Sequence, residues 1–123
     1  MTLTNVHDRL SVTIVLYAFI LAIWGLWRYF RKQGLDGNFW GALAINEILI
    51  LAQGALGIFL WLSDLRPERG FMHILYGIVT ALTIPATYTF TRGRDTRREM
   101  LVYGLVMIAL VGLAGRAIVT GGE

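Results

Sequence analysis

Four long apolar runs divide this chain of 123 residues, and they limit its fold more than any other feature. The runs are 18 to 24 residues long and lie at Leu10–Trp27, Phe39–Leu62, Phe71–Phe90 and Leu101–Val119. A helix crosses the hydrocarbon core of a bilayer with about 20 apolar residues. Because 56% of the residues are apolar and only 15% are charged, lipid is a better solvent for this chain than water.

We therefore predict an all-α integral membrane protein, folded as an up-and-down four-helix bundle. It forms a single transmembrane domain over residues 1–123, with helices at about 8–31, 38–62, 71–91 and 98–119. No small-residue cleavage pattern follows the first run, so we expect the first helix to be retained.

The basic residues are unevenly divided between the two sides of the predicted membrane domain. Seven of the eleven lie in or beside the first and third connections, namely Arg28, Arg31, Lys32, Arg92, Arg94, Arg97 and Arg98. The other four are Arg9, Arg66, Arg69 and Arg116. The positive-inside rule then places both termini outside, N-out and C-out, in a bacterial or archaeal cytoplasmic membrane. Since this asymmetry explains the basic composition, we expect the lipid bilayer as a partner and no nucleic acid.

Several kinds of active site are excluded by what the chain lacks. It has no cysteine, which excludes disulfides, thiolate catalysis and iron–sulfur clusters. It also has no phosphate-binding glycine loop, no GxSxG and no HExxH motif. The function is therefore expected in the bilayer or at its edge.

The two histidines of the chain, His7 and His73, each stand at the start of an apolar run. The first and third helices of an up-and-down bundle run in the same direction and are diagonal partners, so both histidines are expected at one depth. Two imidazoles in that arrangement can bind a heme iron from its two faces. We predict His7 and His73 as the metal ligands of a non-covalent heme b.

Other residues are predicted to complete this heme site. Gly57 and Gly77 would leave room for the flat ring beside the backbone. Arg9 and Arg116 lie on the histidine side, and their planar guanidinium groups suit the two propionates of a heme.

A family resemblance rests on three segments in a fixed order. His7-Asp8-Arg9-Leu10 opens the first helix, Gln53-Gly54-Ala55-Leu56-Gly57 lies late in the second, and His73 opens the third. With this order, the chain resembles one four-helix half of the heme A synthase family. The resemblance implies that His7 and His73 are the axial ligands of one heme, and that Gln53 and Gly57 belong to the helix wall beside it.

The chain departs from that family at Thr4 and Asp8, where the family has glutamate and arginine, and it has one bundle instead of two. We therefore expect no enzyme that oxidises a heme methyl group. With both axial positions filled, one-electron transfer near the outer face is the natural chemistry. A quinol or a larger respiratory or membrane complex is the expected partner, and the bundle is a candidate homodimer.

Two other functions stay open. One is a cofactor-free accessory subunit of a larger membrane complex, in which the faces rich in glycine and alanine are protein interfaces. The other is a small proton-coupled transporter that uses Glu47, because a carboxyl group inside a membrane helix costs about 2.5 kcal/mol or more on insertion scales.

Overall fold

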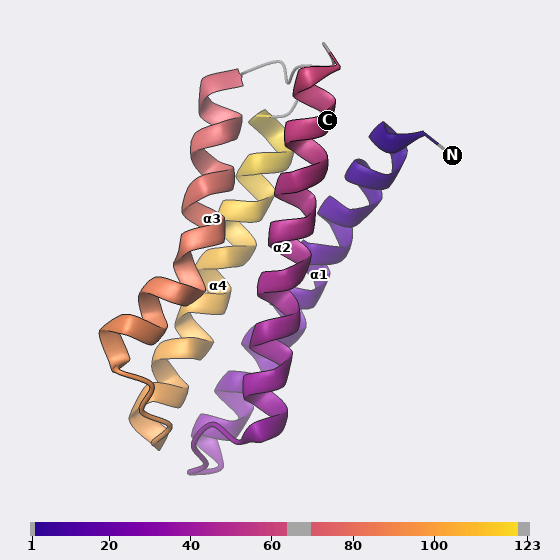
Figure 1. Ribbon diagram of the computed structural model, residues 1–123. Coiled ribbons are helices and arrows are strands. Elements are labelled where there is room, and N and C mark those ends of the chain that lie inside the picture. Colours follow the sequence, from indigo (N-terminus) through magenta and orange to yellow (C-terminus); the bar gives the residue numbers. More distant parts are fainter. Residues whose placement is uncertain (1, 64–69, 121–123) are drawn as a thin grey trace.

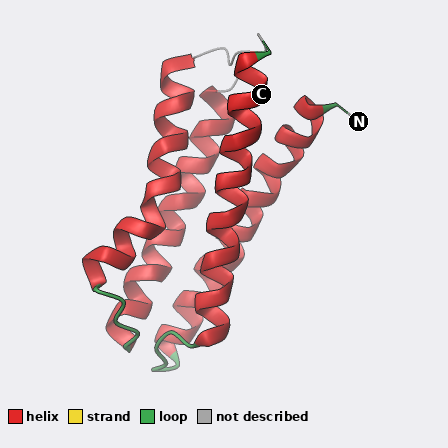
Figure 2. Ribbon diagram, viewed as in Figure 1, coloured by secondary structure: helices red, strands yellow, loops and turns green. Residues whose placement is uncertain are grey.

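The computed structural model describes residues 2–63 and 70–120, and every regular element in these ranges is a helix (Figures 1 and 2). The helices are α1 (Leu3–Phe30), α2 (Gly37–Leu62), α3 (Gly70–Thr91) and α4 (Arg97–Thr120). All four are long and apolar enough to cross a membrane. The predicted fold class, an all-α membrane bundle of four helices, is confirmed.

Side-chain caps decide where the first two helices begin. The Thr2 hydroxyl accepts a hydrogen bond from the Asn5 backbone N–H at 3.1 Å, so α1 begins at Leu3 rather than near residue 8. The Asp36 carboxylate accepts one from the Phe39 N–H at 2.9 Å and starts α2. The early start of α1 places His7 inside a regular helix.

The helices form a ring in which consecutive helices run in opposite directions (Figure 1). Within the described residues, α1 and α3 each pack against α2 and α4, whereas the diagonal pairs α1/α3 and α2/α4 make no backbone contact. We call the end with the starts of α1 and α3 the histidine end. The opposite end, with connections 31–36 and 92–96, is the basic end.

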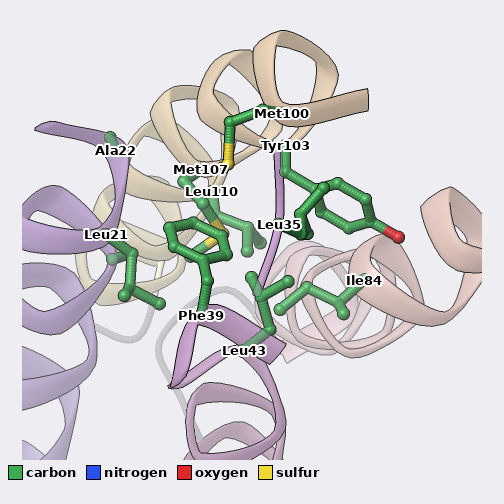
Figure 3. Packing of buried hydrophobic residues seen from close by; sticks show 11 residues of the cluster. Leu21, Ala22, Leu35, Phe39, Leu43, Ile84, Met100, Tyr103, Met107 and Leu110 are labelled. Atoms are coloured by element: carbon green, nitrogen blue, oxygen red, sulfur yellow. The ribbon is translucent and has the colours of Figure 1, made fainter. Parts of the chain in front are cut away.

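The core is concentrated toward the basic end. There, side chains from all four helices converge around Phe39 (Figure 3). Gly25 and Gly104 let the backbones of α1 and α4 approach closely, since a Cβ on Gly25 would lie 3.2 Å from the Gly104 Cα. The main cluster comprises Ala18, Leu21, Ala22, Leu35, Phe39, Leu43, Ile84, Met100, Tyr103, Met107 and Leu110.

The histidine end is packed more sparsely. Its buried apolar cluster is only Ile14, Ile50 and Ala114, with partly buried neighbours around it. In Figure 1 the N-terminal part of α1 leans away from the other helices at this end. The bundle is therefore tight at one end and open at the other.

The outer surface of the helices is largely apolar between the two charged ends of the bundle. Large hydrophobic side chains remain exposed on every helix, including Phe30, Leu62, Phe71 and Phe90, each more than 70% exposed. Such a surface suits lipid rather than water. The C-terminal part of α3 bends outward (Figure 1), and this helix contains Pro85, which removes a helical hydrogen bond.

Candidate functional site

The structure brings the two histidines together across the bundle. The ring centroids of His7 and His73 are 6.3 Å apart, and the ring planes are tilted by 51°. His7 comes from α1 and His73 from α3, the diagonal helices whose backbones do not meet. Both side chains are partly buried. The expected common depth of the histidines is therefore what the fold produces.

A backbone carbonyl fixes the orientation of the His73 ring. Its Nδ1 lies 2.8 Å from the carbonyl oxygen of Ala117 on α4. A carbonyl oxygen only accepts hydrogen bonds, so Nδ1 carries the hydrogen and donates it. In a neutral imidazole this leaves Nε2 with its lone pair, which is the form that binds a metal.

Three hydrogen bonds hold the turn of α1 that carries His7. The Gln53 amide donates to the His7 carbonyl at 2.8 Å and to the Ser11 hydroxyl at 2.5 Å. The Ser11 hydroxyl in turn donates to the His7 carbonyl at 2.9 Å. We call this arrangement the Gln53 clamp. The Gln53 clamp joins α1 to α2 at the sparsely packed end, where the buried apolar cluster between the helices is small.

Gly57, predicted to give clearance for a heme ring, lies beside the His7 ring. A Cβ placed on Gly57 would be 3.4 Å from Nε2 of His7. A methyl group would therefore touch the imidazole, and any larger side chain would press on it. Gly77, one turn from His73, is exposed, and a Cβ there would meet nothing within 4 Å.

The predicted propionate partners are both exposed at this end. The guanidinium carbon of Arg116 lies 5.9 Å from the centre of the Tyr76 ring, which is on α3 one turn from His73. Arg9 follows His7 by two positions on α1. Arg66 and Arg69, which the sequence also assigns to this side, lie outside the described residues.

The donor set fits a metal that brings its own equatorial ligands. Within residues 2–63 and 70–120, no group of three or more His, Cys, Asp or Glu side chains is placed to hold a bare metal ion. Two imidazoles alone are the axial set of a heme. A metal–nitrogen bond is about 2 Å and the ring centre lies about 1 Å further, so ligands on opposite faces have centroids about 6 Å apart. The 6.3 Å separation matches this value, and each ring can rotate about its metal–nitrogen bond to give a 51° tilt.

A further group of polar side chains lies on the inner face of α2, between its middle and Gln53. Asn46 of α2 is completely buried, and neither its amide nitrogen nor its amide oxygen has a hydrogen-bond partner. One carboxyl oxygen of Glu47 and the amide oxygen of Gln53 are also buried without a partner. The burial of Asn46 could have been predicted from the sequence, because Asn46 shares a spacing of three and four residues with the apolar Phe39, Leu43 and Ile50.

Comparison with known proteins adds no identity. No family model matches the chain, and no curated protein or solved structure is significantly similar to it. The resemblance to the heme A synthase family therefore stays a prediction from the residues that carry it.

Proposed function

We propose that this chain is a membrane-embedded bis-histidine heme b protein that transfers single electrons near the outer face of the membrane. One observation supports the proposal above all others: the 6.3 Å separation of His7 and His73 on diagonal helices. A heme held there by His7 and His73 would supply a reversible one-electron couple.

The residues of the chain have distinct roles in this proposal. The Ala117 carbonyl holds the His73 ring in the tautomer whose Nε2 is free to ligate. The Gln53 clamp holds the turn of α1 that carries His7 against α2. Gly57 leaves the His7 ring free of side-chain contact from α2.

The sparse packing of the histidine end also suits a bound flat group. The apolar cluster there holds three buried residues, whereas the cluster toward the basic end holds eleven. A tightly packed interior would oppose the separation of helices that a macrocycle needs. Arg9 and Arg116 are proposed to meet the propionates where the site opens to the headgroups.

Orientation and partner belong to the proposal as well. The excess of basic residues at the basic end favours the cytoplasmic side for that end, with both termini outside. The electron donor or acceptor would then be a quinol in the bilayer or another membrane or periplasmic protein, because the histidine end would lie toward the outer face.

Heme titration of the detergent-purified protein tests the proposal. We expect one equivalent of heme per chain to bind and to give the sharp low-spin bands of bis-histidine ligation. His7→Ala and His73→Ala should each abolish the low-spin spectrum. Tyr76→Phe, a change on α3 one turn from His73, should leave it intact. Failure of the parent protein to bind heme, or low-spin bands that survive both histidine variants, would refute the assignment.

Proton-coupled transport is the second candidate function, and a specific observation favours it. Glu47 lies in the span of α2, and one of its carboxyl oxygens is buried without a partner. An ionisable group inside a membrane helix is a functional candidate. This alternative predicts a pH-dependent flux in proteoliposomes that Glu47→Gln abolishes and His73→Ala leaves unchanged, the reverse of the pattern expected for the heme.

A further inference from the structure

The two connections at the basic end contact each other directly. The Leu35 N–H donates to the Asp95 carbonyl oxygen at 2.9 Å, and a Cβ on Gly34 would overlap that carbonyl. Arg97 strengthens the junction, because its Nε donates to the Tyr29 carbonyl at 2.9 Å and its guanidinium lies 4.2 Å from the Tyr29 ring centre. We call residues 28–36 and 92–99 the basic cap.

The basic cap carries a strong excess of positive charge. Its seven basic residues and its three acidic residues, Asp36, Asp95 and Glu99, give a formal net charge of +4. Two of the acids are engaged within the cap: Arg28 pairs with Asp36 at 3.3 Å, and Arg94 pairs with Glu99 at 3.7 Å. These two ion pairs neutralise one basic residue each, and the other five basic side chains of the cap are exposed.

Six of the seven basic side chains of the cap are exposed. Arg94 pairs with Glu99 and Arg97 bonds the Tyr29 carbonyl, and the other four exposed ones are Arg31, Lys32, Arg92 and Arg98. Lys32 and Arg92 both adopt a positive φ, 59° and 55°, where their helices end. Two helices of different hairpins thus end in a basic turn of the same kind, and the contact between Leu35 and Asp95 holds these turns side by side.

Exposed aromatic side chains lie within the cap and directly beside it on the helices. Trp27, Phe30 and Phe90 are 60%, 72% and 81% exposed, and the Arg31 guanidinium lies 5.6 Å from the Trp27 ring centre. Aromatic rings beside basic groups are typical of the boundary between acyl chains and headgroups. The surface therefore offers cations at headgroup depth and rings at acyl-chain depth.

We propose that the basic cap is a binding site for anionic phospholipids. The phosphodiester oxygens would pair with Arg31, Lys32, Arg92 and Arg98, while the acyl chains lie against Trp27, Phe30 and Phe90. Charge complementarity favours this occupant, because a +4 surface at the membrane boundary faces phosphate groups fixed at the same depth. The site lies at the opposite end from the histidines, and its test does not depend on heme.

Binding of fluorescent phosphatidylglycerol and phosphatidylcholine to the full chain in neutral detergent tests this proposal. We expect the parent to prefer phosphatidylglycerol and to lose the preference as salt rises. A basic residue near an anionic surface contributes about fivefold in affinity, so the pair of changes Arg31→Gln and Lys32→Gln should weaken phosphatidylglycerol binding by about 25-fold.

The matched control keeps the charge at the same place. Arg31→Lys in the otherwise unchanged chain should retain the preference, whereas adding Arg92→Gln and Arg98→Gln to the first pair should remove it altogether. Circular dichroism verifies that each variant keeps its helices. Equal affinity of the parent for both lipids, or a preference that persists in the folded variant with all four changes, would overturn the proposal.

Discussion

Replacing Asn46 by leucine should make the protein more stable. The side chain is 0% exposed, and neither polar atom of its amide has a hydrogen-bond partner. Leaving a buried polar group unsatisfied costs about 1–3 kcal/mol, and leucine has the same branched shape and number of heavy atoms without polar atoms. Its neighbours on the inner face of α2, Leu43 and Ile50, are apolar. We therefore expect Asn46→Leu to raise the free energy of unfolding by about 1–3 kcal/mol.

Gln53 provides the matched comparison on the same helix. It lies two turns from Asn46, but its amide nitrogen donates two hydrogen bonds to α1. Gln53→Leu should therefore be clearly less favourable than Asn46→Leu, because each bond lost costs about 0.5–1.5 kcal/mol and only the single unpartnered amide oxygen of Gln53 offsets this loss. Unfolding in mixed micelles of a mild and a denaturing detergent measures both variants. If Asn46→Leu destabilised the protein as much as Gln53→Leu, Asn46 would have a bonded partner and the reasoning would fail.

Other substitutions test the site and the packing separately. Gly57→Val should weaken heme binding about tenfold or more, because even a Cβ on Gly57 would lie 3.4 Å from the His7 Nε2. The Gly57→Ala variant should bind heme with nearly the affinity of the parent, and heme titration compares the two. Gly25→Val should destabilise the bundle by about 1–3 kcal/mol, because the Gly104 backbone leaves no room for a side chain. At Gly41 a Cβ would meet nothing within 4 Å, so an equal loss of stability in Gly41→Ala would contradict this explanation. Ser11→Ala should lower the free energy of unfolding in micelles by about 1 kcal/mol, because it removes the two hydrogen bonds of the Ser11 hydroxyl while the Gln53 bond to the His7 carbonyl remains. An unchanged free energy of unfolding would show that the Gln53 clamp contributes little to stability.

The helices and their arrangement could be predicted because run length and direction determine them. Four apolar runs joined by short connections give four helices in which neighbours are antiparallel, so the first and third helices run in the same direction. His7 and His73 then meet at one depth without any knowledge of side-chain packing. The start of α1 at Leu3 was missed, because the cap formed by Thr2 lies outside the apolar run.

The contacts that complete the site could not be predicted, because they depend on how each helix is rotated about its axis. Gln53 was expected in the wall beside the heme, but the hydrogen bonds that join it to Ser11 and the His7 carbonyl required the structure. The partner of His73 is the backbone carbonyl of Ala117, which no residue identity reveals. The burial of Asn46 depends on the same rotation of α2.

The central claim is that His7 and His73 share one heme. Its most direct test is a reduced-minus-oxidised visible spectrum of the protein purified from membranes, recorded for the parent and for His7→Ala and His73→Ala. We predict sharp low-spin bands in the parent that vanish or become high-spin in each variant. A parent protein that is colourless, and remains so after heme is supplied, would contradict it.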